Sequence, residues 1–484
     1  MKKFLLALMV VAISVVLAGP AMADLKLTTK GRMDVTGMLV YKNIIDRAAN
    51  AGNDSTNAWY QQELVIDPTL HINDKVRIHS RITIMERNWT GGSGDGDNFP
   101  TFAGNGVVNP LIGTITYTNY PTSNAQWDTN YRGQHNWWVE RLYMSFPLMG
   151  GHLYTGRMSG GAWAYTFQDS DANRDRIKYV RKFGKVLGVG LVEKLGEDDG
   201  GLLATNGTLL TQAPAAGDTF DKSYSDTNAY AFGLVIPFSK NIVWKPLIYY
   251  IQFQGLNGYD ALLLNGFGIK FAQSFSFDIE FNWRWGTWDN FFAGAASPDL
   301  ERSQLSAWAE VAWRGGPFEA GLGGFWIQGE GDANTTGTNK RQAIWGLGGE
   351  FQPYLLFLSE DCGLLWNTTG VANGSAQANG SGYQSIYLRG SYKLSDSMKL
   401  SGIFGMMMAD KMLAGTHWNG GTASDDLGTE IDLTFQWKLM DNLTYVVDAG
   451  YLFAGNYFDD AFGAANFDPS NDVFGFRHML VIEW

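Results

Sequence analysis

Apolar and polar residues alternate one by one in many separate stretches of the chain. Every second position is apolar in residues 275–285, 386–394 and 431–439, and the positions between them are mostly polar or charged. An extended strand places two such sets on opposite faces, because successive side chains of a strand point to opposite sides. A helix would instead distribute the charges around its whole surface. The alternation therefore predicts a chain built of β-strands.

The connections between these stretches fall into two length classes. Short ones include Asn73–Lys75, Gly184–Lys185 and Met440–Asn442, whereas Gly91–Gln134 and Glu197–Asp226 are long and rich in small polar residues. Short turns at one rim and long loops at the other are typical of transmembrane β-barrels, whose turns are periplasmic and whose loops are extracellular. We therefore predict an all-β fold, a transmembrane antiparallel up-and-down β-barrel.

The number of strands follows from the number of alternating stretches. Roughly twenty candidates are present, and two termini at the periplasmic rim require an even number. The stretch Tyr354–Trp366 alternates weakly and can instead be a folded loop. We predict about 18 strands, with a range of about 16 to 20.

The first residues have the layout of a secretory signal peptide. Lys2 and Lys3 precede an apolar run over residues 4–19, and Ala21-Met22-Ala23 supplies small residues for cleavage. The alternative is an uncleaved membrane anchor, but the run is shorter than the ~20 residues of a spanning helix. We predict a signal peptide over residues 1–23 and a single barrel domain over residues 24–484. With export and a barrel, the expected location is the outer membrane of a Gram-negative bacterium.

Composition narrows the function classes further. The chain has 59 glycines, 18 tryptophans, one cysteine and a formal net charge of −12. A single cysteine, Cys362, excludes an intramolecular disulfide framework and a zinc-finger cage. The negative charge disfavours nucleic acid as a partner, because nucleic-acid binding depends on a basic surface. No histidine falls into a metal-binding pattern, and no local motif supports an enzyme. We expect no catalytic residue, metal or cofactor.

The last stretch of the chain carries a specific signal. Phe474, Phe476, Leu480, Ile482 and the terminal Trp484 share one face of the predicted final strand. This pattern resembles the C-terminal signal that outer-membrane barrels present to the barrel assembly machinery. An ordinary edge strand that ends by chance in tryptophan is the alternative.

One motif resembles a known family. Residues 139–157 read Val-Glu-Arg-Leu-Tyr-Met-Ser-Phe, a Pro-Leu-Met-Gly-Gly turn, and His-Leu-Tyr-Thr-Gly-Arg. This succession is similar to the fourth and fifth strands of the trimeric general porins of Gram-negative outer membranes. The chain departs from the family in being longer than a barrel of about sixteen strands needs. It also ends in tryptophan, where the family usually has phenylalanine.

The resemblance implies two functional loops. In the family, the loop after the Gly-Arg strand folds into the barrel and narrows the pore, and here it corresponds to residues 159–173. The family's second loop latches onto a neighbouring subunit, which implies a homotrimer with residues 90–136 as the latch. The family also sets basic side chains on the barrel wall against acidic ones on the inward loop. The loop residues carried over in this way are Trp163, Tyr165, Phe167, Asp169 and Asp171.

Strand alternation selects basic residues for the inner wall independently. Ile177, Tyr179 and Phe183 form an apolar face, so the positions between them face the lumen. Opposed charges across a water-filled channel would orient dipolar solutes and give a modest ion preference. The constriction candidates on the wall are Arg77, Arg81, Arg141, Arg157, Arg174, Arg176 and Lys178.

These observations predict an outer-membrane porin. It would form a water-filled channel for the passive diffusion of small hydrophilic solutes and ions, surrounded by outer-membrane lipid and lipopolysaccharide. One alternative is a substrate-selective channel for sugars or organic acids, in which Trp163, Tyr165 and Phe167 form a stacking surface. Another is an adhesive or structural barrel that its own loops plug, which predicts no ion current.

Overall fold

The structure is a computed structural model of the whole chain. It describes residues 25–41, 56–88, 108–109, 113–114, 137–165, 167–168, 171–196, 227–253, 258–288, 300–329, 340–341, 351–358, 382–411, 424–457 and 472–484. The predicted signal peptide and Asp169 lie outside these residues, as does nearly all of the predicted latch over 90–136.

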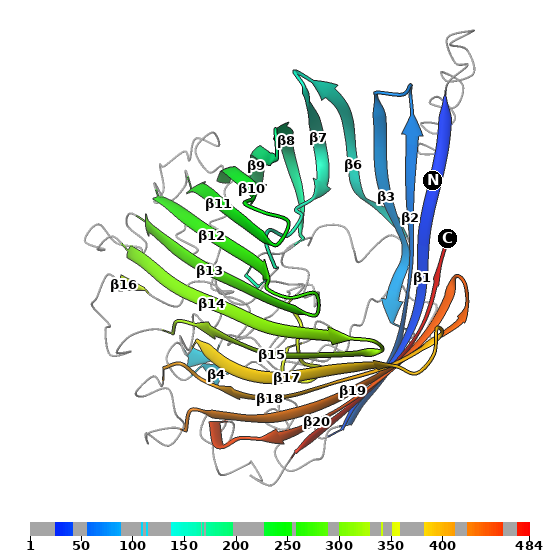
Figure 1. Ribbon diagram of the computed structural model, residues 1–484, viewed down its shortest axis with the longest axis vertical. Coiled ribbons are helices and arrows are strands. Elements are labelled where there is room, and N and C mark those ends of the chain that lie inside the picture. The colour runs from blue at the N-terminus through cyan, green and yellow to red at the C-terminus, as the bar shows by residue number, and fades with distance from the viewer. Residues whose placement is uncertain are drawn as a thin grey trace.

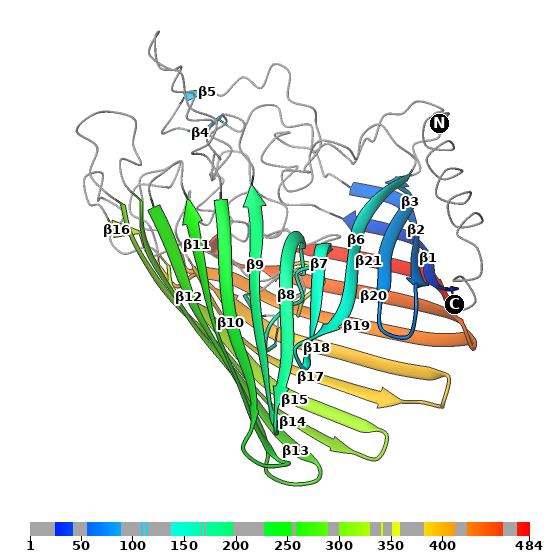
Figure 2. The same cartoon turned by 90° about the horizontal axis from the view of Figure 1, so that it is seen from above.

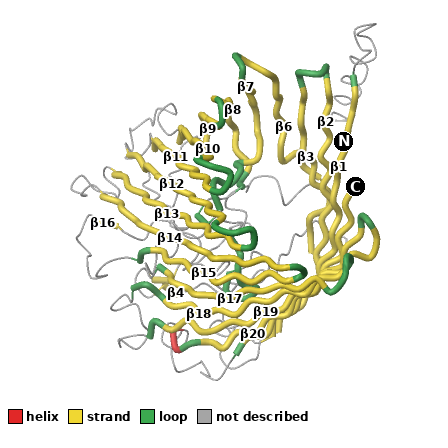
Figure 3. The backbone as a smooth tube through the Cα atoms, in the orientation of Figure 1, coloured by secondary structure: helices red, strands yellow, loops and turns green. Residues whose placement is uncertain are grey.

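Almost all of the described chain is extended (Figure 3). The first half of the barrel contains β1 (Lys26–Tyr41), β2 (Thr56–His71), β3 (Arg77–Asn88), β6 (Trp137–Leu148), β7 (Gly151–Ser159), β8 (Asn173–Phe183), β9 (Val186–Gly196), β10 (Thr227–Pro237) and β11 (Ile242–Phe253). The second half contains β12 (Gly258–Lys270), β13 (Phe275–Trp288), β14 (Leu300–Gly315), β15 (Phe318–Ile327), β17 (Tyr383–Lys393), β18 (Met398–Met408), β19 (Asp426–Met440), β20 (Leu443–Ala454) and β21 (Val473–Glu483). The remaining strands are pairs of residues: β4 (Val108–Asn109), β5 (Gly113–Thr114) and β16 (Lys340–Arg341).

The long strands close into a barrel of 18 antiparallel strands (Figure 1). Each strand pairs with its neighbours in chain order, and β1 completes the ring by pairing with both β2 and β21. At this seam Gly31 and Trp484 exchange two backbone hydrogen bonds of 3.1 Å. Closure removes every free sheet edge, which is the condition for a β-structure in lipid. The predicted fold class is confirmed, and so is the strand number.

Tight turns lie at one rim of the barrel (Figure 2). They join β6 to β7, β8 to β9 and β14 to β15, and most of the strand ends at the other rim are separated by longer stretches of sequence. Gly184 (φ 60°) and Gly316 (φ 57°) adopt left-handed conformations in these turns, which glycine tolerates best. In outer-membrane barrels, the rim with the tight turns is the periplasmic one.

The two faces of each strand differ as the alternation predicts. On β8, Ile177 is 53% exposed and outward, whereas its neighbour Arg176 is 7% exposed. On β19, Leu433 is 55% exposed and Asp432 only 6%. The apolar face therefore points out of the barrel, where lipid would cover it, and the polar face lines the lumen. No helix among the described residues is long and apolar enough to cross a membrane.

The final strand presents its apolar face outward. Leu480 and Trp484 are 41% and 51% exposed, and the register of β21 against β1 places Phe476 on the same side. This arrangement leaves the predicted assembly signal accessible from outside the barrel. Its recognition by the assembly machinery stays a prediction.

The largest cluster of buried apolar side chains lies inside the ring rather than between two layers. It joins residues of the segment 351–358 to Phe167 and to the inner faces of several strands. Residues 351–358 form no strand, so the strand reading of Tyr354–Trp366 is wrong for its described part, and the folded-loop alternative holds there. The segment is not part of the barrel wall because it is buried on all sides, and the side chains of Leu356, Phe357 and Leu358 are 0% exposed.

Candidate solute pathway

Basic side chains gather on the inner face of three strands, β3, β6 and β8, and β7 pairs between the last two. We call Arg77, Arg81, Arg141, Arg174, Arg176 and Lys178 the basic wall. Cross-strand pairing arranges them in rows that follow one another from the tight turns toward the loops. The first row is Arg77–Ser145–Tyr154–Lys178, the second is His79–Tyr143–Gly156–Arg176, and the third contains the pairs Arg81–Arg141 and Met158–Arg174.

Part of the basic wall is neutralised by carboxylates. Arg81 donates two hydrogen bonds, of 2.8 and 2.9 Å, to Asp67 on β2. Arg176 lies 2.5 Å from Glu193 on β9, and both side chains are almost fully buried. Bidentate or buried pairs of this kind fix the geometry of the guanidinium. These arginines therefore form a rigid part of the wall.

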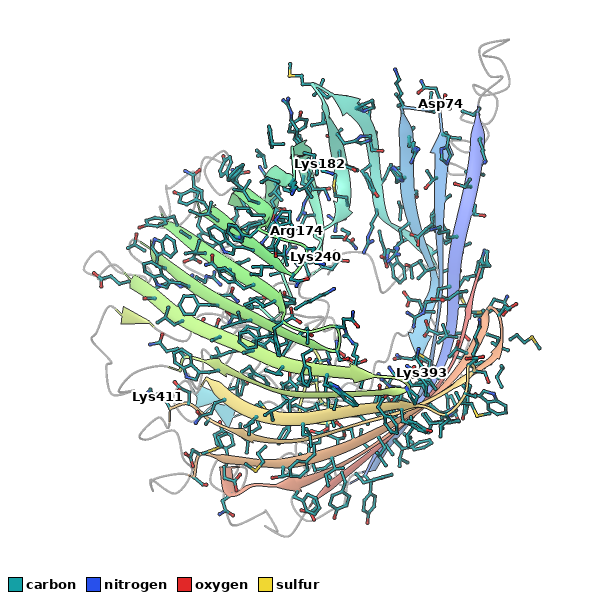
Figure 4. All side chains as sticks on the ribbon, in the orientation of Figure 1. Asp74, Arg174, Lys182, Lys240, Lys393 and Lys411 are labelled. Atoms are coloured by element: carbon teal, nitrogen blue, oxygen red, sulfur yellow. The ribbon has the colours of Figure 1, made fainter. Side chains whose placement is uncertain are left out.

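The rest of the basic wall keeps its positive charge. In the part of the chain that the structure describes, no ion pair joins Arg77, Arg174 or Lys178 to a carboxylate. The Lys178 ammonium lies 5.1 Å from the centre of the Tyr154 ring. Figure 4 shows Arg174 on β8 at the inner edge of the ring of strands. The wall thus carries an excess of positive charge toward the lumen.

Arg157 does not belong to this wall, and its predicted lumen orientation is wrong. It pairs across the sheet with Leu142, which is 55% exposed on the outer face, and with Asp175. Its guanidinium lies 3.2 Å from the Asp175 carboxylate on that outer face. Alternation along β7 gives the reason, since Arg157 has the same parity as the outward Thr155, which pairs with Ile177.

Asp171 lies beside the basic wall rather than across the pore from it. Its Oδ2 is 3.7 Å from Arg141, and its Oδ1 accepts hydrogen bonds from the Ser159 hydroxyl and from the Gly161 amide at 2.7 Å. Asp171 is therefore not the expected loop carboxylate that faces the basic wall from across the pore. Asp169, the other predicted acid, lies outside the described residues.

Residues 160–165 and 167–168, which we call the first inward segment, lie inside the barrel and contact the inner wall from β10 to β15. The Trp163 indole donates to the Lys245 carbonyl at 2.9 Å. The Tyr165 hydroxyl donates to Asp278 at 2.7 Å, and its backbone amide donates to Glu280 at 2.9 Å. Burial and this bond to Asp278 raise the pKa of Tyr165, which keeps the phenol protonated. The predicted loop is thus inside the barrel, and its narrowing of the pore stays a prediction.

Glycines on the inner wall make room for this segment. A Cβ at Gly233 would lie 2.7 Å from the Trp163 ring, and one at Gly266 would lie 2.5 Å from the Ala164 Cβ. Glycine in a strand often marks such a close approach. Alternating glycines on the inward face of a strand are therefore a sequence signal for an inward segment.

Phe167 cannot form part of a solute surface. It is 0% exposed and packs against Phe325 and Phe351, with ring centres 6.0 and 5.2 Å away. Phe167 is therefore not part of the predicted aromatic stacking surface, which was to contain three residues. Trp163 and Tyr165 are partly exposed and remain available.

Residues 351–358, the second inward segment, were not predicted as part of the pathway. Two carboxylates on β19 hold their backbone. Asp432 accepts the Leu355 amide at 3.0 Å, and Glu430 accepts the amides of Leu356 and Phe357 at 2.5 and 2.8 Å. Glu280 on β13 plays the same part toward the first inward segment. In both strands the sequence signal is a pair of acids two positions apart on the lumen face, Asp278-Ile-Glu280 and Glu430-Ile-Asp432.

The two inward segments contact each other through Phe167 and Phe351. Together they line the lumen from β10, where Trp163 packs on Gly233, to β21, where Leu356 packs on Gly475. The first inward segment reaches the basic wall through the Gly160 carbonyl, which accepts a hydrogen bond from Arg176. A solute in the lumen would therefore meet fixed positive charge on one side and the partly exposed rings of Trp163 and Tyr165 on the other.

Comparison with known proteins finds solved structures of similar fold, but no match by sequence. No protein-family model matches the sequence, and a search of curated proteins finds no match. Among solved structures, OpdL of Pseudomonas aeruginosa is 12% identical, with a TM-score of 0.52 over 95% of this chain and 99% of that one. OpdK of the same organism, solved with vanillate, is 9% identical, with a TM-score of 0.50 over 94% and 98%. A BenF-like porin from Pseudomonas fluorescens Pf-5 is 8% identical, with a TM-score of 0.51 over 94% and 98%.

At these identities the likeness shows the fold alone. The chain has the closed 18-stranded barrel fold of these outer-membrane porins. The porin part of the predicted resemblance is thereby supported. The similar solved structures do not support its finer part, the trimeric general porins.

Proposed function

We propose that this protein is a substrate-selective outer-membrane channel for small organic acids. The observation that carries the proposal is the basic wall, whose Arg77, Arg174 and Lys178 form no ion pair with a carboxylate of the described residues. Positive charge on a low-dielectric wall raises the local concentration of anions. Arginine matches a carboxylate in two parallel hydrogen bonds. OpdK, solved with vanillate, is a fold neighbour that holds an aromatic acid.

The inward segments favour selectivity over general diffusion. They fill part of the lumen with ordered side chains and backbone that carboxylates anchor. A narrower path brings each solute into contact with the wall, so fixed charge and shape act on it more strongly. A general porin is therefore the less favoured reading, and a plugged adhesive barrel would carry no current.

Neutralising one cation of the basic wall tests the proposal. Replacing Arg174 by glutamine is expected to weaken block of the ion current by vanillate about tenfold, because a charge-assisted hydrogen bond contributes about 1.5–3 kcal/mol. The reversal potential in a salt gradient should also shift toward cation preference. Single-channel recording of purified protein in a planar bilayer measures both quantities.

Arg157 offers a matched control. It lies on β7 next to the Met158–Arg174 pair but faces outward, so Arg157→Gln removes the same charge from outside the lumen. Block and reversal potential should stay at their original values in this variant. Equal effects of the two substitutions, or equal block by uncharged vanillyl alcohol, would contradict an organic-acid channel.

Oligomeric state and assembly are separate proposals. The homotrimer implied by residues 139–157 predicts a detergent-extracted particle of three chains and current steps that close in threes. The aromatic face of β21 predicts that Trp484→Ala lowers the yield of folded barrel. Lipid and lipopolysaccharide stay predicted partners of the outward apolar face.

A further inference from the structure

A cavity of about 290 Å³ lies on the inner wall away from the basic wall. The second inward segment covers one side of it through residues 352–355, and strands β17 to β21 supply the rest of its lining. Its lining residues on β17 and β18 come just before and after the tight turn at 394–397, and they include Arg389, Ser391, Lys399 and Ser401. The cavity therefore lies between the second inward segment and the tight-turn rim.

A row of hydroxyl groups forms the middle of this cavity. Register places Ser391, Ser401 and Thr434 side by side on β17, β18 and β19, and the row continues to Asp448 and Arg477. Asp448 accepts the Thr434 hydroxyl at 2.6 Å and the Arg477 guanidinium at 2.8 Å. Both of its oxygens are thus occupied, and Arg477 balances its charge.

The cations on the two sides of this row differ. Toward the second inward segment, Arg389 donates to Glu310 at 2.5 and 2.8 Å and to Glu319 at 3.1 Å. Toward the rim, Lys399 is half-buried, and among the described residues no carboxylate forms an ion pair with it. The half-buried ammonium and the serine hydroxyls beside it can donate hydrogen bonds to an anion. An anion bound there would replace the water around the ammonium.

We propose that this cavity is a binding subsite for a small hydroxylated organic anion, such as a sugar acid. Lys399 would receive the carboxylate, and Ser391 and Ser401 would exchange hydrogen bonds with the hydroxyls of the ligand. The volume is close to the lower limit of ligand pockets, roughly 300 Å³, which restricts the ligand to a small molecule. The subsite rests on the proposed organic-acid channel and adds to it a second, hydroxyl-reading contact.

Gluconate is the probe for this subsite. Block of single-channel current by gluconate is measured in the parent protein and in Lys399→Gln. The substitution is expected to raise the gluconate dissociation constant about tenfold. Glucose, which lacks the charge, and hexanoate, which lacks the hydroxyls, should both block more weakly than gluconate in the parent protein.

Lys393 provides the matched control. It is the cross-strand partner of Lys399 on β17, is exposed, and does not line the cavity. Lys393→Gln should leave the gluconate constant unchanged. If Lys399→Gln does not fold, Ser401→Ala carries the same test, because it removes the hydroxyl without adding atoms to the cavity.

The outcomes separate this inference from the proposed function. Unchanged gluconate block in Lys399→Gln, or an equal loss in Lys393→Gln, overturns the subsite and leaves the organic-acid channel in place. Loss of gluconate block in Lys399→Gln with unchanged vanillate block in Arg174→Gln supports the subsite and contradicts the role of the basic wall.

Discussion

Replacing Glu430 by alanine is expected to give the channel a second, larger conductance level. The change leaves the Leu356 and Phe357 amides buried without their acceptor, which costs about 1–3 kcal/mol for each amide. Burial of Leu356, Phe357 and Leu358 contributes roughly 5–9 kcal/mol to holding the segment. Because this penalty opposes the burial and is of similar size, the second inward segment should exchange between an anchored and a released state. Single-channel traces would show this exchange as flickering.

The control for this experiment is Glu319→Gln. Glu319 is also a lumen carboxylate, but its partners are Arg314 and Arg389 rather than an inward segment. It should keep a single conductance level, which separates anchoring from charge. Heat-modifiable mobility in electrophoresis shows that each variant is folded. A steady, parental current in folded Glu430→Ala would show that the carboxylate does not hold the segment.

Replacing Gly266 by valine is expected to lower the conductance. The new Cβ would stand 2.5 Å from the Ala164 Cβ, so the first inward segment must move off the wall toward the pore axis. Overpacking of this kind lowers the free energy of unfolding by about 1–3 kcal/mol. The displacement would also break the hydrogen bond of Tyr165 to Asp278, which contributes about 1 kcal/mol or more. Conductance and thermal stability, measured on the same preparation, give both effects.

Gly190→Val makes the same substitution where space is free. No atom lies within 4 Å of a Cβ at Gly190, which shares the outward face of β9 and β10 with Phe232. Valine favours strands, so this variant should keep both the parental current and the parental stability. An unchanged or higher conductance in folded Gly266→Val would contradict the packing of the first inward segment against β12.

The orientation of most lumen side chains could be predicted from alternation. Arg174, Arg176 and Lys178 face the lumen because Ile177 between them faces outward. Alternation gave the wrong face for Arg157, because the register across the β6–β7 turn pairs it with the outward Leu142, whereas Met158 pairs with Arg174. The sequence reading placed residues 159–173 inside the barrel by resemblance, whereas the contacts of Trp163 and Tyr165 identify the strands that hold them.

The second inward segment shows the limit of local pattern. Apolar residues 354–358 read as a weak strand, since a short apolar run is compatible with several structures. What holds the run inside the ring is Glu430 and Asp432, more than 70 residues later in the chain. The Glu-Ile-Asp spacing predicts two carboxylates on the lumen face, but it does not predict which backbone amides they bind.

The sequence by itself determined the barrel, its two rims and the two faces of its strands. These properties are local, because a strand alternates its side chains whatever its neighbours are, and turn length is read directly from the chain. Only the tertiary structure decided which residues meet across the lumen. The rows of the basic wall, the contact of Phe167 with Phe351 and the cavity beside Lys399 depend on the register and closure of 18 strands. Register is a property of strand pairs, and closure is a property of the whole ring, so neither is written in any one segment.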